Sequence, residues 1–315
     1  MRALVAGGAG FIGRAMCMKL LERGDEVVCV DNLVTGSIEH VKELSQQPRF
    51  SFVEADISEG VEVAGPLDAV LNLACPASPA DFGPLSLEIL NTGSRGVAHL
   101  LEVARVNHAR FLQASTSEVY GDPLVHPQAE TYWGNVNPIG VRSVYDEAKR
   151  FGEALTMAFH RRYGTEVRIA RIFNTYGPGM RPDDGRVVSN FVTQALRGQP
   201  LTVYGDGSQT RSLCYVEDEV DGLLKLLSSD YTGPVNVGND DERTVREIAE
   251  LVIELTGTDS EIAIAPLPAD DPTQRRPDLS IARGTIGWEP STALRVGLGS
   301  TIEWFKSRLG ANIKP

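Results

Sequence analysis

Metal-binding residue types are scarce in this sequence of 315 residues. The five histidines do not cluster near any cysteine, and the four cysteines lack the paired spacing of a zinc site, standing at Cys17, Cys29, Cys75 and Cys214. We therefore expect free thiols and no bound metal.

Long apolar runs are absent as well. No stretch approaches the roughly 18 consecutive apolar residues of a membrane span. The N-terminal MRALVAGGAG leads directly into a strand pattern and lacks the basic and apolar regions of a signal peptide. These absences predict a cytoplasmic protein without a membrane partner.

Positive charge is in short supply, because 30 lysines and arginines face 42 aspartates and glutamates, for a formal net charge of −12. Nucleic acids and anionic membranes require a basic surface, so both are excluded as partners. A small anionic substrate is not excluded, because a few arginines in one cleft can dominate the local field.

Short apolar runs alternate with helix-period segments along the first half of the chain, at residues 2–6, 26–30, 50–56, 69–74, 110–115 and 166–172. This alternation is typical of an α/β fold with a doubly wound parallel sheet. After about Asn174, proline and glycine interrupt the pattern. We predict a nucleotide-binding domain at 1–174 and a smaller mixed α/β lobe at 175–315, with segments exchanged between them because no flexible linker separates them.

A glycine-rich turn follows the first strand, with Gly7, Gly10 and Gly13 leading into an amphipathic helix. Such glycines allow a sharp turn and close approach of a pyrophosphate to the helix N-terminus. The next strand ends in Asp31, which is placed to accept both ribose hydroxyls of an adenosine and to repel a 2′-phosphate. The sequence therefore predicts NAD rather than NADP.

Asp56 follows the third strand-like run. Two interpretations are open: a contact to the adenine edge, or a cap of a helix that begins in ISEG.

Tyr145 and Lys149 stand four residues apart in SVYDEAKRF, a helix-favouring run, so both can face one cleft. A cation lowers the pKa of a nearby phenol, and Lys149 would thus make Tyr145 a usable base. Taken alone, such a pair is more often an exposed helix pair. The dinucleotide signal upstream changes this balance and favours a catalytic base.

Thr116, Ser117 and Glu118 follow the run at 110–115, at the expected carboxyl end of a parallel strand, where ligands bind in such sheets. The hydroxyls can hold a substrate oxygen, and Glu118 can move a proton. A capped turn is the simpler alternative, with Ser115 as the cap. A phenolate beside a nicotinamide predicts hydride abstraction from a carbinol.

Several motifs together identify a resemblance: GGAGFIG, STSEVYGDP, YDEAK, RIFNTYGP, DGRVVSNF, LTVYGDGSQTR and RRPD. They resemble the Rossmann-type extended short-chain dehydrogenase/reductases, and among them the UDP-glucuronate decarboxylase (UDP-xylose synthase) family. The similarity runs from the first strand to WEP near residue 290. It implies that NAD oxidises C4 of UDP-glucuronate, that the 4-keto acid loses carbon dioxide, and that the ketone is then reduced.

The resemblance also implies residue roles. Tyr145 would be the C4 base, Lys149 its electrostatic support, and Thr116 or Ser117 a hydrogen-bonding partner of the sugar. Glu118 would lie near the carboxylate and C5, with Arg275 as its cationic partner or, alternatively, as a clamp on the UDP diphosphate.

Binding residues follow in the same way. Besides the three glycines, Asp31, Asp56, Tyr145 and Lys149, the implied NAD contacts are Phe11, Ile12, Asn32, Thr35, Gly36, Ile57, Leu73, Ala74 and Arg186. The implied UDP-sugar contacts are Asn174, Thr202, Tyr204, Arg211 and Arg275. Among these, loop or strand structure is a comparable explanation for all but Arg211 and Arg275.

The chain departs from the family pattern at Arg14, Ala15, Ser37, Asn91 and Gly179. Two or three of these changes remove cations near the cofactor or substrate. The resulting hypothesis is that NADH is held less tightly and that some product leaves as UDP-4-keto-xylose.

Two other functions remain open, a UDP-glucuronate 4-epimerase and a dinucleotide-sensing module without activity. The resemblance further implies a homodimer through a four-helix interface at 88–106 and 142–163. Apolar residues there exceed what one sheet face needs, although packing within the chain is the simpler explanation; they are Leu101, Phe151, Leu155 and Phe159.

Overall fold

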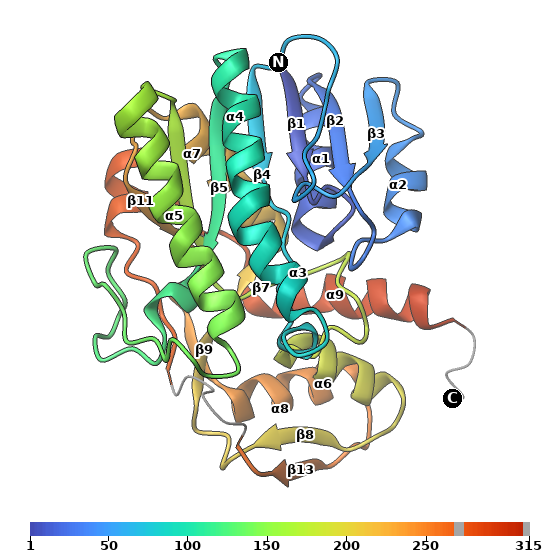
Figure 1. The fold of residues 1–315 in the computed structure, drawn as a ribbon. Coiled ribbons are helices and arrows are strands. Elements are labelled where there is room, and N and C mark those ends of the chain that lie inside the picture. Colours follow the sequence, from blue (N-terminus) through green and yellow to red (C-terminus); the bar gives the residue numbers. More distant parts are fainter. Residues whose placement is uncertain (268–273, 311–315) are drawn as a thin grey trace.

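The structure is a computed structural model that describes residues 1–267 and 274–310, and its centre is a seven-stranded parallel sheet (Figure 1). The strand order is β11-β6-β5-β4-β1-β2-β3. The strands are β1 (Arg2–Ala6), β2 (Glu26–Asp31), β3 (Phe50–Glu54), β4 (Ala69–Asn72), β5 (Arg110–Thr116), β6 (Val167–Ile172) and β11 (Pro234–Val237). The order reverses between β1 and β4, which creates the crevice where doubly wound sheets bind ligands. The predicted fold class is confirmed.

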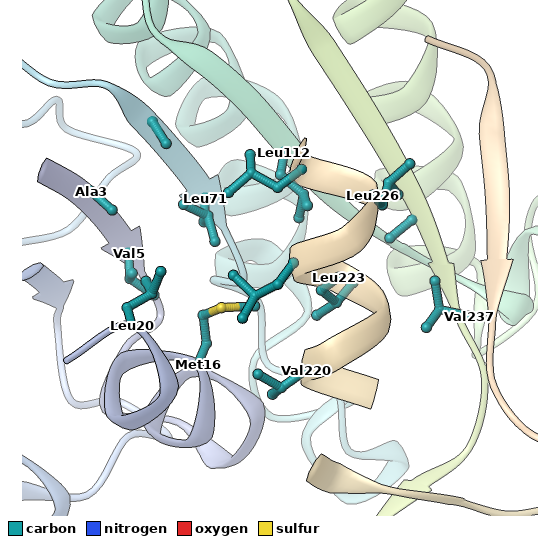
Figure 2. Packing of buried hydrophobic residues seen from close by; sticks show 14 of the residues in the cluster. Ala3, Val5, Met16, Leu20, Leu71, Leu112, Val220, Leu223, Leu226 and Val237 are labelled. Carbon is teal, nitrogen blue, oxygen red and sulfur yellow. The ribbon is translucent and has the colours of Figure 1, made fainter. Parts of the chain in front are cut away.

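Helices cover both faces of this sheet. One face carries α1 (Phe11–Glu22) and α7 (Val216–Ser228), and the other carries α4 (Val97–Asn107) and α5 (Ser143–Tyr163). Figure 2 shows Met16 of α1 extending toward Leu223 of α7, with the sheet residues Leu71 and Leu112 above them, while Leu20 of α1 lies on the side of β1. All five are fully buried, and each such side chain contributes roughly 1.5–3 kcal/mol relative to exposure.

Short elements connect the main ones along this part of the chain. Helix α2 (Ile38–Leu44) follows β2, and a 3-10 turn (Pro79–Asp81) precedes α3 (Ser86–Asn91). A wide helical turn (Thr92–Gly96) joins α3 to α4, and α5 packs so closely against it that a Cβ at Gly93 would lie 2.6 Å from that of Ala148.

The smaller lobe has its own core. It is built on α6 (Val187–Leu196), α8 (Val245–Thr256) and α9 (Leu294–Leu309), with the parallel pair β8 (Leu201–Tyr204) and β13 (Ile262–Ala265). Two further pairs lie between the lobe and the sheet: β7 (Thr175–Tyr176) with β10 (Cys214–Tyr215), and β9 (Thr210–Ser212) with β12 (Glu242–Thr244).

A single division at residue 174 does not separate the two parts. Strand β11 and helix α7 belong by sequence to the predicted lobe 175–315, yet β11 pairs with β6 at the edge of the central sheet and α7 packs on that sheet. The chain therefore leaves the first domain, starts the lobe, and returns before finishing it.

Across residues 1–267 and 274–310, no helix is both long and apolar enough to cross a membrane. The same residues hold no group of three His, Cys, Asp or Glu side chains that is arranged to bind a metal ion.

Candidate active site

The glycine-rich turn closes tightly around the start of α1. Gly7 has a φ of +77°, and a Cβ there would lie 2.7 Å from the backbone of Ala74. A Cβ at Gly13 would overlap the carbonyl oxygen of Gly7. Gly10 is the N-cap of α1, and the first turn holds no acidic residue. The first backbone N–H groups are thus arranged for a pyrophosphate, as NAD requires.

Asp31, at the end of β2, holds two loops in place. One carboxylate oxygen accepts the Ala9 N–H at 3.0 Å and the other accepts the Leu33 N–H at 2.9 Å. Burial raises the pKa of Asp31, against the lowering effect of these two bonds. Because each carboxylate oxygen has a second lone pair, both can still accept ribose hydroxyls.

Asp56 lies beside Asn32, whose amide donates to it at 3.0 Å. It also accepts the Ser58 N–H at 2.8 Å, but residues 57–59 form a turn and a bend. The prediction of a helix that begins in ISEG is therefore wrong, and Asp56 caps a turn instead. Asp56 lines a small cavity together with the glycine turn. The predicted NAD residues that also line this cavity are Asn32, Thr35, Gly36, Ile57, Leu73 and Ala74.

A larger cavity of about 550 Å³ opens beyond the carboxyl ends of β5 and β6. It brings together residues that are far apart in the sequence, from both the sheet and the lobe. The predicted site residues that line it are Ile12, Leu73, Thr116, Ser117, Glu118, Tyr145, Lys149, Asn174, Arg186, Thr202, Tyr204, Arg211 and Arg275. The side chain of Phe11 instead packs against the core of the smaller lobe.

Tyr145 and Lys149 lie together on the buried side of α5, only 6% and 5% exposed. The Lys149 ammonium is 5.6 Å from the centre of the Tyr145 ring and donates a hydrogen bond to the Ala114 carbonyl at 2.8 Å. The ring of Phe82 stacks on Tyr145 with centroids 5.1 Å apart. The predicted pair is thus inside the cavity rather than on an exposed helix face.

In the protein by itself, burial opposes the acidification of Tyr145 that the sequence predicted, and the support of Tyr145 by Lys149 stays a prediction. Burial raises the pKa of Tyr145, and a hydrogen bond with Thr116 lowers it only in part. Burial also lowers the pKa of Lys149. Both charged forms lose hydration inside the protein, and this loss favours the neutral form of each.

Glu118 is held between two arginines. Its Oε1 accepts from Arg275 at 2.6 Å and its Oε2 accepts from Arg142 at 2.8 Å. Burial would raise the pKa of Glu118, but the guanidinium groups of Arg275 and Arg142 outweigh burial and lower it to about 2. Glu118 is therefore an anion at neutral pH in this arrangement, and the proton transfer that the sequence suggested for it stays a prediction.

Arg275 has the partner that the sequence predicted. It is 2% exposed, and besides Glu118 it donates to the Ser117 hydroxyl at 3.0 Å and the Gly121 carbonyl at 3.1 Å. With its fork directed at these groups, the pairing with Glu118 is favoured over a diphosphate clamp.

The predicted nucleotide contacts lie on the lobe side of the cavity. The Thr202 hydroxyl and backbone N–H are both bonded to the amide of Gln194 at 3.0 Å. Arg211 donates to the Thr210 carbonyl at 2.8 Å. Arg186 forms a two-pronged ion pair with Asp184 and lines the larger cavity with Tyr145, not the small cavity by the glycine turn.

The departures from the family pattern have structural roles of their own. Arg14 pairs with Glu43 at 2.5 and 2.8 Å, and its guanidinium lies 5.2 Å from the centre of the Trp304 ring on α9. Ser37 caps α2 through the Glu39 N–H. Gly179 has a φ of +101°, which only glycine adopts readily. Arg14 is thus engaged with the lobe.

Ala15 and Asn91 are the two remaining departures from the family pattern. Ala15 packs against the main core, and Asn91 ends α3 with an exposed side chain. Neither carries a charge toward the cavity.

Sequence reasoning missed Arg142 and Phe82, which both line the larger cavity. Arg142 stands three residues before Tyr145, at the start of α5, where it reads as an ordinary helix-start residue. Phe82 lies in a loop without a motif, so no sequence signal marked it.

The sequence family described as the NAD dependent epimerase/dehydratase family matches residues 3–238. Solved structures agree: the UDP-glucose 4-epimerase of Thermotoga maritima with UDP-glucose has a TM-score of 0.89 at 30% identity, covering 98% of this chain and all of that one. The UDP-glucuronic acid 4-epimerase of Bacillus cereus, with UDP-glucuronic acid and NAD, has a TM-score of 0.88 at 26% identity over 98% and 100% of the two chains. The chain belongs to this NAD-dependent family.

Curated relatives narrow the assignment. UDP-glucuronic acid decarboxylase 6 of Arabidopsis thaliana is 52% identical over 311 residues, which is 98% of this chain and 90% of the relative. UDP-glucuronic acid decarboxylase 1 of Danio rerio is 46% identical over 98% of this chain and 73% of the relative. Within the larger family, the chain is a member of the UDP-glucuronic acid decarboxylase group.

Proposed function

We propose that the protein decarboxylates UDP-glucuronate through a 4-keto intermediate, with NAD as a recycled cofactor. The observation that carries this proposal is a single cavity that holds a buried Tyr145–Lys149 pair and a fixed Glu118–Arg275 ion pair next to the glycine turn. The relatives at about half identity support the same substrate and reaction.

Each side chain has a task that follows from its place. NAD, which the glycine turn and Asp31 would hold, would supply the hydride acceptor for C4 of the sugar and the hydride donor for the final reduction. As the phenolate, Tyr145 accepts the proton of the C4 hydroxyl and later gives it back, and Thr116 orients its oxygen. Lys149, anchored on Ala114, supports the phenolate. Ser117 and the Glu118–Arg275 pair hold the sugar where the C5 to carboxylate bond breaks.

The product is UDP-xylose, or UDP-4-keto-xylose when NADH leaves before the final reduction. The second outcome is supported by the cations of the family pattern that Ser37, Asn91 and Gly179 replace on the cofactor or substrate side, since none of these three residues carries a charge. Mass spectrometry of the products, with NADH measured in parallel, tests this. Formation of UDP-xylose alone, without NADH, would contradict release of the keto sugar.

Incubation with UDP-glucuronate separates the proposed functions. Decarboxylation gives carbon dioxide and a lighter nucleotide sugar, whereas a 4-epimerase gives a uronate of unchanged mass. The epimerase is a second candidate because a solved UDP-glucuronic acid 4-epimerase shares the fold. A dinucleotide sensor would bind NAD and leave UDP-glucuronate unchanged.

We also infer a homodimer built on α3 and α5. Leu87 on α3 is 69% exposed and Phe151 on α5 is 50% exposed, which leaves an apolar face uncovered. Leu101 is fully buried within the chain, so it does not belong to this face. Leu155 and Phe159 are partly buried against the same core. Sedimentation at micromolar concentration tests the inference, and a monomer contradicts it.

A cytoplasmic location is part of the same proposal. It is supported by the four thiols, all of which are free and three of which are buried. Fractionation of cells that express the tagged protein tests it.

A further inference from the structure

Arg142 connects two parts of the site that come from different elements. Its guanidinium is bonded to Oε2 of Glu118, which follows β5, while its backbone is the N-cap of α5, the helix that carries Tyr145. Both side chains of this ion pair are only 15% exposed. The contact is therefore shielded from solvent, and removing one partner would leave the other charge buried without compensation.

The same guanidinium has an aromatic contact. Its central carbon lies 5.6 Å from the centre of the Phe82 ring, and Phe82 in turn stacks on Tyr145 with an interplanar angle of 18°. Phe82 is 6% exposed. Arg142, Phe82 and Tyr145 thus form a continuous stack along one wall of the cavity.

These contacts restrict the orientation of Glu118. The last torsion of a glutamate is broad and nearly two-fold, so a carboxylate held at one oxygen can still turn. In this site Arg275 holds Oε1 and Arg142 holds Oε2, so both oxygens are fixed. Without Arg142, Glu118 would keep one partner and lose its defined plane.

We propose that Arg142 is a positioning residue that locks Glu118 in one orientation relative to Tyr145. This inference rests on the proposed function. The lock couples the two chemical events: the sugar is oxidised at C4 next to Tyr145, and C5 with its carboxylate already lies beside the Glu118–Arg275 pair when the ketone forms. Nothing in the lock acts on the hydride transfer itself.

The test measures the two steps separately in Arg142→Met and Arg142→Lys. In a single turnover with UDP-glucuronate and NAD, NADH absorbance reports oxidation and labelled carbon dioxide reports decarboxylation. We expect NADH formation to change by less than about threefold in Arg142→Met and carbon dioxide release to fall on the order of 100-fold, because misplacing a reacting group by about 1 Å has that effect. NADH and UDP-4-keto-glucuronate then accumulate. Arg142→Lys retains the positive charge but not the two-pronged geometry of the guanidinium. We expect its carbon dioxide release to lie between that of the unmodified protein and that of Arg142→Met.

Arg181→Met is the matched control. Arg181 pairs with Asp81, next to Phe82, and removing it loosens the same loop without touching Glu118. We expect its two steps to keep the ratio of the unmodified protein. A double mutant of Arg142→Met with Glu118→Gln should be no worse than Glu118→Gln alone, because the two changes remove one interaction.

The proposal would be overturned if Arg142→Met lost NADH formation and carbon dioxide release equally. It would also be overturned if carbon dioxide release were unchanged. The same uncoupling in Arg181→Met would also overturn it, because the effect would then belong to the loop. If the unmodified protein oxidises UDP-glucuronate without releasing carbon dioxide, the proposed function is wrong, and this is seen before any variant is compared.

Discussion

At the scale of single residues, the chemistry depends on how burial changes the charges of the cavity. Tyr145 and Lys149 are each driven toward their neutral forms, whereas Glu118 remains an anion because two guanidinium groups contact it. Spacing in the sequence predicts which side chains face one another. It does not predict desolvation, which depends on the whole fold, and this is why the pKa direction of Tyr145 came out opposite to expectation.

Replacing Tyr145 by Phe should reduce turnover of UDP-glucuronate by roughly 10²- to 10⁴-fold, the range for loss of a positioned acid or base. Binding of UDP should persist, because the ring and its stack on Phe82 remain. Initial rates by mass spectrometry and UDP titration measure both. Tyr163→Phe, at the exposed end of the same helix, is the control and should retain full activity. Intact turnover in Tyr145→Phe would reject the base assignment.

Asp146, next to Tyr145, gives a pH-dependent prediction. Burial first, and then the Glu118 carboxylate, raise the pKa of Asp146 to about 7. Its Oδ1 is buried without a hydrogen-bond partner among the described residues. A carboxyl with a raised pKa binds its proton more tightly in the folded state, so it stabilises the fold below its ordinary pKa of about 3.9 and loses that contribution as the pH rises through about 7.

Asp146→Asn should remove this loss. The free energy of unfolding of the variant relative to the unmodified protein should rise steadily between about pH 4 and pH 7. Urea unfolding across that range measures it, and other titrating groups cancel in the difference. A difference that does not vary with pH would show that Asp146 keeps its ordinary pKa.

At the scale of helices and strands, the sheet was the most predictable feature. Parallel strands covered on both faces appear in sequence as short continuous apolar runs, and the six runs before residue 174 all became strands of one sheet. Strand β11 has the same character, but no local signal says which sheet it joins. The pairing of β11 with β6 is a tertiary fact, and so is the placement of Arg142 and Phe82.

The turn before α1 gives a prediction at this scale. Gly13→Ala should abolish NAD binding and lower the free energy of unfolding by about 1–3 kcal/mol or more, because the added methyl overlaps the Gly7 carbonyl and overpacking costs that much. Thermal unfolding and NAD titration measure the two effects. Gly299→Ala is the control, since a Cβ there has no neighbour within 4 Å among the described residues. Normal NAD affinity in Gly13→Ala would contradict the proposed cofactor turn.

Helix α9 of the lobe contacts the cofactor side of the first domain. Trp304 packs between the guanidinium groups of Arg14 and Arg308, and its ring lies 6.4 Å from that of His40. Nδ1 of His40 lies 2.9 Å from the Ala9 carbonyl oxygen in the glycine turn. Trp304 and His40 thus connect α9 to the glycine turn.

Trp304→Leu should therefore speed NADH dissociation by about tenfold, because one cation–π contact contributes about 0.5–2 kcal/mol. Displacement of NADH, followed by its fluorescence, measures this without turnover. Trp133→Leu is the control, because Trp133 is 88% exposed. An unchanged dissociation rate in Trp304→Leu would mean that α9 does not help to retain the cofactor.

At the scale of the whole molecule, the proposed homodimer would bury the exposed apolar side chains of α3 and α5. Leu87→Glu combined with Phe151→Glu should convert the proposed dimer into a monomer, because each charge would be desolvated in the interface. Sedimentation velocity measures the change. Leu124→Glu, another exposed position but on a different segment, should leave the dimer intact. A dimer that persists in the double variant would place the interface elsewhere.

Because β11 pairs with β6 but follows it by about sixty residues in the chain, one edge of the sheet stays unpaired during part of synthesis. When β6 has left the ribosome at Ile172, its outer edge has no neighbour until the chain has been translated through Pro234–Val237. An open strand edge is a template for pairing with other chains. Nascent chains that have been translated past β6 but not through β11 therefore expose this unpaired strand edge to neighbouring chains. Chaperone capture should concentrate there, and stop codons placed shortly after residue 174 should yield insoluble fragments.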